Sequence, residues 1–234
     1  MKLFFGSIEP EIRIQEEEQQ HIVKVLRMKQ GEEIFVTDGK GNLVKGTLLF
    51  EGKKVILEET ERFTQKENFS KRLHIAIAPT KNIDRIEFFL EKAVEMGISE
   101  VTFIQTEKSE RKNINLDRLQ KQAVGASKQS LRVHFPIVND LTKLSDFIKN
   151  INPENTFVAH CHENLERTSL RTLELKKEEK SDYTFLIGPE GDFSEKEIQL
   201  LSDSGVKAVS LGEQRLRTET AGLFVAAWNY NQMI

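Results

Sequence analysis

Residues 186–194 read Leu-Ile-Gly-Pro-Glu-Gly-Asp-Phe-Ser, a glycine–proline loop between an apolar run and a helix start. The apolar run over 183–187 predicts a buried strand, and Ser194 with Glu197 has the spacing of a capping box. The glycines let the backbone approach a flat ligand, and Pro189 stiffens the turn. In proteins with a parallel sheet, ligands bind at the carboxyl ends of the strands, so this loop is a candidate binding loop. Many loops of this composition, however, only reverse the chain direction.

Residues 211–221 read Leu-Gly-Glu-Gln-Arg-Leu-Arg-Thr-Glu-Thr-Ala and again follow a predicted strand and precede a helix. Thr218 is expected to cap this last helix, which runs to the C-terminus. Arg215, Arg217 and Glu219 put three ionisable groups at the strand end, which favours a polar site. Ordinary surface charge, with a carboxylate favoured at the start of a helix, would also explain these residues. That explanation must account for two such loops, each at the carboxyl end of a predicted parallel strand.

Outward from these loops, the C-terminal two-thirds of the chain alternates strands with helices, which predicts a mostly parallel α/β sheet. Further strands of this sheet are predicted over 73–78, 101–104, 156–159 and 206–211. The first two helices of the domain are predicted over 83–94 and 116–130.

The first 65 residues predict a small β-barrel-like module with tight glycine turns. A short amphipathic helix is expected over about 17–28, and polar residues 61–68 are interpreted as the linker. The module's strands are predicted over 33–37, 43–49 and 54–58. The domain boundaries that follow are 1–68 for the module and 69–234 for the α/β domain.

Composition predicts a soluble intracellular protein. Of the 234 residues, 38% are hydrophobic and 30% charged, as in ordinary globular domains. The single cysteine, Cys161, excludes an intrachain disulfide and fits a reducing cytosol. No signal peptide is visible, and no apolar run approaches the ~20 residues of a membrane helix. We therefore expect a cytoplasmic protein that does not enter a membrane.

Charge is unevenly distributed along the chain. The net charge of −3 argues against a general nucleic-acid binder. The stretch 108–134, however, carries seven basic residues against Glu110 and Asp117. A local basic stretch is compatible with a specific RNA contact, although composition alone favours a solvated helix face.

Other ligand motifs are absent from the sequence. Gly39 and Gly41 lack the third glycine of a dinucleotide-binding turn, and no P-loop pattern occurs. His160, Cys161 and His162 are adjacent on an extended segment, where side chains alternate in direction, and no second cluster completes a tetrahedral set. No metal is therefore expected.

The two C-terminal motifs together closely resemble those of the bacterial 16S rRNA uracil N3-methyltransferases of the SPOUT (α/β-knot) superfamily. The likeness extends over nearly the whole chain. Residues 21–29 are similar to the family's N-terminal His–Val-Leu-Arg segment in a PUA-like domain, and 81–97 and 109–136 fit its first helix and the following basic stretch. Four positions depart from the family pattern: Asp192 replaces a second glycine, Arg215 an aliphatic residue, Lys128 an acid and Leu3 an arginine.

The resemblance implies an N-terminal PUA-like β-barrel and a C-terminal SPOUT domain with a deep trefoil knot. It implies S-adenosyl-L-methionine as cofactor, S-adenosyl-L-homocysteine as product, no metal, a homodimer, and 16S rRNA or the small ribosomal subunit as partner. The cofactor-binding residues that it implies are Leu186, Ile187, Gly188, Pro189, Glu190, Gly191, Leu211, Gly212, Leu216, Arg217, Thr218, Thr220 and Ala221.

The implied reaction is methyl transfer to uracil N3, whose proton must first be removed. Arg217 and Arg132 are candidates for stabilising the resulting anion, and Glu219 is a candidate base. Alternatively, Arg217 only binds phosphate and Glu219 only favours the helix start. The residues expected to hold RNA are His21, Lys24, Arg27, Arg85, Arg111 and Arg132.

Three other functions stay open at this point. One is a related knotted methyltransferase acting on another RNA or another atom. A second is a non-catalytic RNA-binding protein that kept the PUA-like module, against which the intact cofactor motifs speak. The third is a metabolic α/β enzyme unrelated to RNA.

Overall fold

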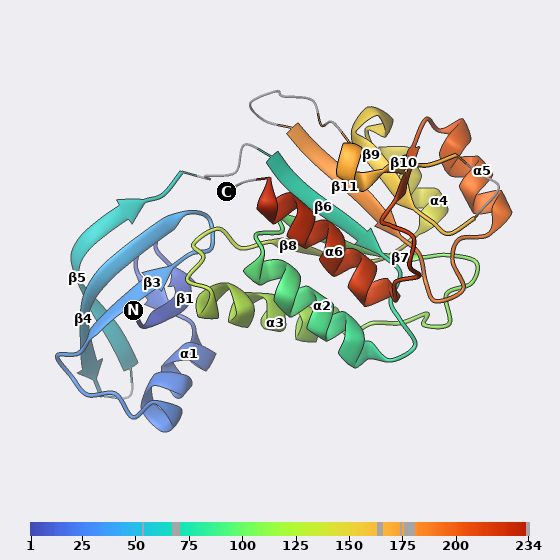
Figure 1. Cartoon of the computed structure of the whole chain (residues 1–234). Coiled ribbons are helices and arrows are strands. Elements are labelled where there is room, and N and C mark those ends of the chain that lie inside the picture. The colour runs from blue at the N-terminus through green and yellow to red at the C-terminus, as the bar shows by residue number, and fades with distance from the viewer. Residues whose placement is uncertain (53, 67–70, 163–165, 174, 176–180, 233–234) are drawn as a thin grey trace. The chain divides into compact units, whose positions relative to one another are not determined.

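The computed structural model describes all residues except 53, 67–70, 163–165, 174, 176–180 and 233–234 (Figure 1). The chain divides into two compact units. Unit 1 comprises Met1–Asn68 with Val124–Phe135, and unit 2 comprises Phe69–Ala123 with Pro136–Ile234. The boundary expected after residue 68 lies outside the described residues. Residues 124–135, which sequence reasoning places in the α/β domain, cluster with unit 1.

Unit 1 contains a five-stranded sheet in the order β2-β1-β3-β4-β5, in which only the β1–β3 pair is parallel. Alternate apolar residues of β3 and β4, such as Ile34, Val36 and Val44, are completely buried in its core. The strands are β1 (Leu3–Ser7), β2 (Arg13–Ile14), β3 (Glu33–Thr37), β4 (Asn42–Glu51) and β5 (Lys54–Thr64).

Strand β5 is longer than predicted, so the interpretation of 61–64 as linker is wrong. Those residues are polar but extended, because they pair with the start of β4: Glu61 lies opposite Lys45 and Thr64 opposite Asn42. A strand exposed on both faces has no apolar alternation, and sequence patterning therefore misses it.

The predicted helix over 17–28 is shorter and less regular than expected. It begins as α1 (Glu16–Gln20), continues as a π-helix over His21–Val25, and ends before Arg27, whose φ is +50°. Ile22 is completely buried, whereas Val23 and Val25 are exposed. The wider π-turn has a different period from the 3.6 residues that the prediction assumes.

Unit 2 is built on a seven-stranded sheet in the order β10-β12-β9-β11-β6-β7-β8, in which every pair is parallel. This confirms the predicted parallel α/β architecture. Two edge strands, β8 and β10, were not predicted, because β8 is largely polar and β10 has two residues. The strands are β6 (Lys71–Ile77), β7 (Glu100–Gln105), β8 (Ile137–Lys143), β9 (Thr156–Ala159), β10 (Thr168–Ser169), β11 (Ser181–Ile187) and β12 (Lys207–Ser210).

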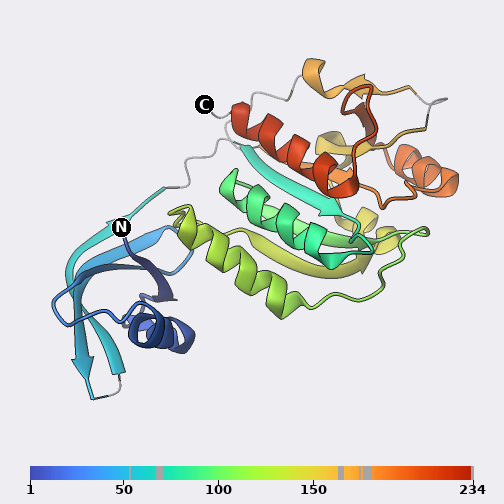
Figure 2. The same ribbon diagram turned by 60° about the horizontal axis from the view of Figure 1, so that its bottom comes forward.

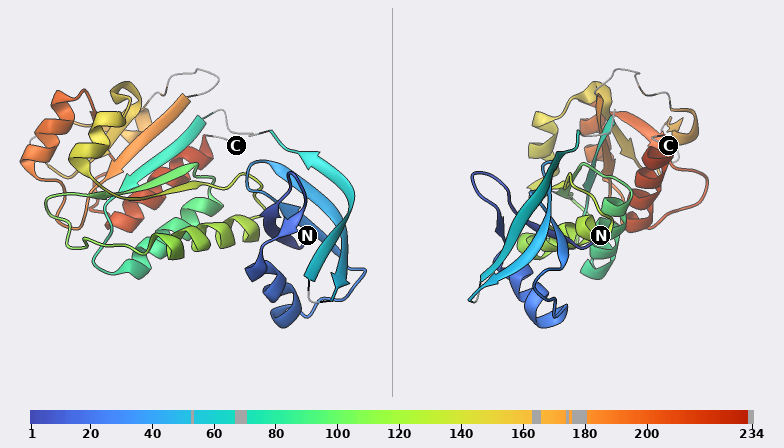
Figure 3. Two further views of the ribbon diagram at one scale, coloured as in Figure 1. Left: turned by 180° about the vertical axis from the view of Figure 1, so that it is seen from behind. Right: turned by 90° about the vertical axis from the view of Figure 1, so that its left-hand side faces the viewer.

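Helices cover both faces of this sheet, as the views in Figures 2 and 3 show. Helices α2 (Ile83–Glu95) and α6 (Thr218–Asn231) pack side by side on one face, where Phe185 of β11 contacts Trp228. The next residue, Leu186, points to the other face and joins the core under α4 (Leu144–Phe147) and α5 (Glu195–Asp203). The remaining helices are α3 (Leu116–Gln129), η2 (Ile148–Asn150), η3 (Pro153–Asn155) and η4 (Leu170–Thr172).

The strand order determines which loops meet. Strand β9 lies between β12 and β11, so the segments that follow Ala159, Ile187 and Ser210 emerge at one edge of the sheet. Within the described residues, no helix is long and apolar enough to cross a membrane.

Candidate functional site

A cavity of about 640 Å³ lies at the carboxyl ends of β9, β11 and β12. Its volume is within the range of small-molecule and cofactor sites. We call it the edge cavity. It is lined by Ala159, His160, Cys161, His162, Arg167, Ile187, Gly188, Pro189, Glu190, Gly191, Asp192, Val209, Leu211, Gly212, Gln214, Arg215, Leu216, Arg217, Thr218 and Ala221.

The structure brings almost all the residues expected to bind a cofactor to this cavity. The exceptions are Leu186, which is completely buried in the sheet, and Thr220, which is exposed on α6. Residues absent from that expectation also line the cavity, among them His160, Cys161 and Arg167. The family resemblance implies that a loop near 159–162 lies beside the cofactor, and the position of β9 between β12 and β11 brings the end of β9 to both motifs.

Thr218 joins the two motif loops. Its hydroxyl is buried and donates a hydrogen bond of 3.0 Å to the carbonyl oxygen of Gly188. The expectation that Thr218 caps α6 is wrong: Arg217 occupies the cap position, and no side chain there accepts a capping bond. Glycine is favoured at position 188 because a Cβ would lie 3.0 Å from two ring atoms of the buried Phe193, so the ring would have to shift.

Asp192 connects the 188–194 loop to the end of β9. It has a φ of +61°, and its Oδ1 accepts a 2.8 Å bond from the amide of Phe193. Its Oδ2 accepts a second 2.8 Å bond from the amide of Cys161. The expected capping box of the helix that follows is present, with Ser194 and Glu197 bonding reciprocally.

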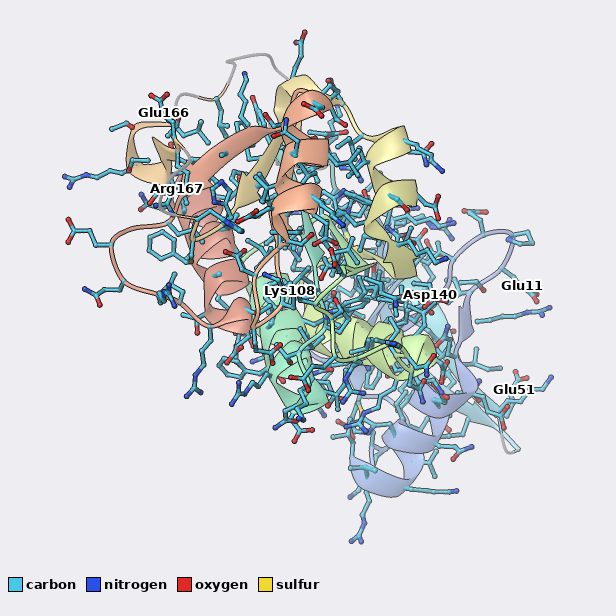
Figure 4. The ribbon with its side chains drawn as sticks, turned by 90° about the vertical axis from the view of Figure 1, so that its right-hand side faces the viewer. Glu11, Glu51, Lys108, Asp140, Glu166 and Arg167 are labelled. Carbon is cyan, nitrogen blue, oxygen red and sulfur yellow. The ribbon has the colours of Figure 1, made fainter. Side chains whose placement is uncertain are left out.

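Two basic residues after β7 fix the neighbouring loops. Lys108, labelled in Figure 4, donates from Nζ to the carbonyl oxygens of Gly191 at 2.9 Å and Phe193 at 3.2 Å. Arg111 donates from Nε to the carbonyl of Thr80 and from Nη2 to that of Lys81, at 3.0 and 2.6 Å. The guanidinium expected to hold RNA is thus engaged in supporting the loop after β6.

His160 is a buried imidazole in the wall of the edge cavity. Burial lowers the pKa of His160 to about 4, so the ring is neutral near pH 7. Its Nδ1 accepts a 3.2 Å bond from the amide of His162, which leaves the proton on Nε2. Within the described chain Nε2 is buried and finds no hydrogen-bond partner. The described residues contain no group of three His, Cys, Asp or Glu side chains that could hold a metal ion.

The three candidate catalytic residues lie in different surroundings. Arg217 is exposed and lines the edge cavity. Glu219 is buried and does not line it; its Oε1 lies 3.8 Å from Nε of Arg85, and its Oε2 has no partner among the described residues. Arg132 follows α3 and belongs to unit 1.

The other residues expected to hold RNA include three on unit 1. His21, Lys24 and Arg27 are all exposed on or just after the π-helix. Lys128, where the resemblance leads one to expect an acid, forms an ion pair with the buried carboxylate of Glu18. This pair gives the basic residue a structural role inside unit 1.

The chemistry of the edge cavity suits a ligand that carries both charges and an aromatic base. The carboxylate of Glu190 can face a cationic group, and the guanidinium of Arg217 can face a carboxylate or phosphate. Ile187, Leu211 and other apolar side chains supply surfaces for a flat ring. The free Nε2–H of His160 adds one buried donor.

Comparisons with known proteins agree over the whole chain. Residues 67–229 match the family model of the RNA methyltransferase domain, and residues 14–59 match that of the RNA methyltransferase PUA domain. The ribosomal RNA small subunit methyltransferase E of Rickettsia conorii is 29% identical over 209 residues, covering 88% of this chain and 84% of that protein.

Two solved structures have the same fold. One, described as a probable rRNA-methyltransferase from Porphyromonas gingivalis, is 36% identical, with a TM-score of 0.89, and covers 99% of this chain and 98% of its own. The other is a ribosomal RNA small subunit methyltransferase E from Neisseria gonorrhoeae bound to S-adenosyl methionine. It is 24% identical, with a TM-score of 0.82, and covers 97% of this chain and 95% of its own.

Proposed function

Since the chain belongs to the RNA methyltransferase family, we propose that it transfers a methyl group from S-adenosyl-L-methionine to N3 of a uracil in 16S ribosomal RNA. The observation that carries this proposal is the edge cavity, in which both motif loops and the end of β9 meet. Curated relatives named ribosomal RNA small subunit methyltransferase E support the substrate class. A structural neighbour bound to S-adenosyl methionine supports the cofactor.

The residues of the edge cavity fit this cofactor. We propose that backbone groups of Gly188, Gly191 and Leu211 bind the adenine and that the carboxylate of Glu190 balances the cofactor's positive charge. His160 offers a neutral donor whose burial without a partner is otherwise unfavourable. The cofactor supplies an electrophilic methyl group on a sulfonium, and its product is S-adenosyl-L-homocysteine.

The protein's own task is to produce and orient the uracil nucleophile. A bond forms between N3 and the methyl carbon while the sulfur–carbon bond breaks, and the N3 proton passes to a base. Arg217, exposed in the edge cavity, favours the N3 anion by attracting the negative charge on O2 and O4. Arg132 remains a candidate for stabilising the same anion. Glu219 is buried and does not line the edge cavity, so we propose that a water molecule at N3 accepts the proton. Alignment of the two reactants supplies a large share of the rate.

Unit 1 is proposed to bind the RNA as a PUA-like domain. Its match to the RNA methyltransferase PUA domain and its exposed His21, Lys24 and Arg27 support this role. Arg85, which lies half-buried on α2, is a further candidate contact. Arg111 would then act on RNA only indirectly, through the loop it holds. Phosphate contacts of this kind position the RNA, whereas base contacts select the nucleotide.

The protein is further proposed to be a cytoplasmic homodimer with a trefoil knot in unit 2. Support for the dimer comes from α6, whose apolar residues are not confined to one face and which exposes Phe224 and Tyr230, while the adjacent α2 exposes Phe88. Support for the knot comes from the family match and from the late strands β9, β11 and β12 meeting at the cofactor motifs.

The test combines binding with product analysis. Calorimetry with S-adenosyl-L-methionine should give a micromolar dissociation constant, and small ribosomal subunits treated with protein and labelled cofactor should yield N3-methyluridine on nucleoside mass spectrometry. Arg217→Ala should lower methyl transfer at saturating S-adenosyl-L-methionine at least a hundredfold. Arg171→Ala is the matched control, because Arg171 is exposed in unit 2 outside the edge cavity.

Retention of N3-methyluridine in 16S rRNA of cells that lack the gene would refute the assigned substrate. Methylation at another atom or in another RNA would indicate a related knotted methyltransferase. Binding of RNA without any turnover would indicate a non-catalytic RNA-binding protein.

A further inference from the structure

A short segment after β9 is bonded directly to the motif loop after β11. We call residues 160–162 the His-Cys-His strap. The amide of Cys161 donates to Oδ2 of Asp192 at 2.8 Å, and the ring Nε2 of His162 lies 3.0 Å from the carbonyl oxygen of Phe193. The same Nε2 lies 3.9 Å from Oδ2 of Asp192. One contact therefore joins a backbone amide of the strap to a side chain of the loop, and the other joins a side chain of the strap to a backbone carbonyl of the loop.

Asp192 has a conformation that is unusual for a residue with a side chain. Its φ of +61° lies in the left-handed region, which glycine adopts without strain and aspartate tolerates better than most residues. A glycine would satisfy this backbone but could not accept a hydrogen bond from another loop. The side chain is thus the feature that needs an explanation.

Both carboxylate oxygens of Asp192 are used. Oδ1 accepts from the amide of Phe193 in its own loop, while Oδ2 accepts from the amide of Cys161 in the strap. The side chain is a quarter exposed, and it lines the edge cavity. A charged acceptor that holds two amides makes stronger bonds than a neutral acceptor.

We propose that Asp192 is a positioning residue that clips the His-Cys-His strap to the 188–193 loop, holding two walls of the edge cavity in their binding geometry before the cofactor arrives. This inference rests on the proposed function for the identity of the cofactor. Walls that are already in place need no ordering on binding, so the clip increases affinity by preorganisation. His160, which precedes Cys161 in the strap, also lines the edge cavity.

Three substitutions separate the clip from the backbone strain. Asp192→Gly keeps the left-handed conformation and removes both bonds. Asp192→Ala removes both bonds and adds strain, while Asp192→Asn tolerates the conformation and keeps one carbonyl acceptor. If the clip positions the walls, the dissociation constant for S-adenosyl-L-methionine should rise about threefold in the Asn variant and about tenfold in the Gly variant. If only backbone conformation mattered, Asn and Gly would both bind like the wild type.

A kinetic measurement distinguishes positioning from catalysis. With small ribosomal subunits as substrate, Asp192→Gly should raise KM for the cofactor by the same factor as its dissociation constant, and kcat at saturation should stay within about twofold. Asp140→Gly is the matched control. Asp140, labelled in Figure 4, accepts a comparable bond of 2.7 Å from the amide of Leu141, but it lies on β8 and does not line the edge cavity.

A second measurement needs no cofactor. The Cys161 amide should exchange with solvent at least several-fold faster in Asp192→Gly than in the wild type, as followed by nuclear magnetic resonance, and should be unchanged in Asp140→Gly. Equal exchange in Asp192→Gly and wild type would overturn the clip. If the wild type binds the cofactor and Asp192→Gly binds it with the same dissociation constant, the positioning role alone is overturned. If the wild type binds no cofactor, the proposed function is overturned as well.

Discussion

Adding one methyl group to Gly222 in α6 should destabilise the protein, whereas the same change at Gly125 in α3 should stabilise it. A Cβ on Gly222 would lie 2.6 and 2.9 Å from two ring atoms of Phe89 and 3.2 Å from Ile77. Phe89 and Ile77 are both completely buried, so neither can move aside cheaply. Gly125 is exposed, and a Cβ there would meet nothing within 4 Å.

The magnitude follows from two opposing terms. Alanine is favoured over glycine in a helix interior by about 1 kcal/mol, and this gain applies at both sites. Overpacking a closed core costs roughly 1–3 kcal/mol, and this cost applies only at Gly222. Gly125→Ala should therefore gain about 1 kcal/mol, and Gly222→Ala should lose up to about 2 kcal/mol.

Differential scanning calorimetry of the full chain measures both changes. A change of about 1 kcal/mol shifts the melting temperature of a chain of this size by roughly 2–4 °C. The two variants should move in opposite directions, and their difference isolates the packing cost. If Gly222→Ala stabilises as much as Gly125→Ala, the close packing of α6 on α2 and β6 is not what requires glycine there.

Three further predictions concern single interactions. Thr218→Val removes the hydroxyl that donates to the Gly188 carbonyl, so it should lower both the unfolding free energy and the free energy of cofactor binding by about 1–2 kcal/mol. Thr218→Ser keeps the hydroxyl and should restore both quantities. Equal denaturation midpoints for the Val and Ser variants would contradict this prediction. Because burial lowers the pKa of His160 from 6.5 to about 4, the unfolded chain binds a proton between these pH values that the folded chain does not, and the unfolding free energy should fall as the pH is lowered through this window. The variant His160→Asn should show a smaller dependence of unfolding free energy on pH. Burial also lowers the pKa of His74, which should account for part of the pH dependence that remains. Lys128→Met should cost about 3 kcal/mol in urea unfolding by leaving the Glu18 carboxylate buried and unpaired, and adding Glu18→Gln should recover most of that loss; an additive double mutant would show that the pair is not coupled.

Local patterns in the sequence predict much of unit 2. The apolar run at 156–159 is strand β9, the capping box at Ser194 opens α5, and the two motif loops meet in one cavity. These features depend on neighbouring residues, whose preferences are readable along the chain. The same holds for the hairpin between β3 and β4 in unit 1.

Non-local contacts account for what sequence reasoning missed. The family resemblance implies a loop near 159–162 beside the cofactor, but not the bonds of the His-Cys-His strap to the motif loop, which form because β9 is inserted between β12 and β11. Residues 124–135 belong to unit 1 through long-range contacts such as Lys128 with Glu18 and the bridge between Lys40 and His134. The bond from Arg111 to the loop after β6 likewise turns an expected RNA contact into an internal support.

The parallel order of the sheet in unit 2 also has a consequence for synthesis and folding. Strand β11 pairs with β6, and the register places Ser181 opposite Lys71. More than a hundred residues must therefore be synthesised after β6 before the central pair of strands can form. Such non-local pairing slows folding, and at about 5–20 residues per second the ribosome delays it further. Among the described residues, those that line the edge cavity all come from Ala159 onward. A nascent chain released before residue 221 therefore has no complete binding site, and in the interval the edge of β6 is exposed to incorrect strand pairing.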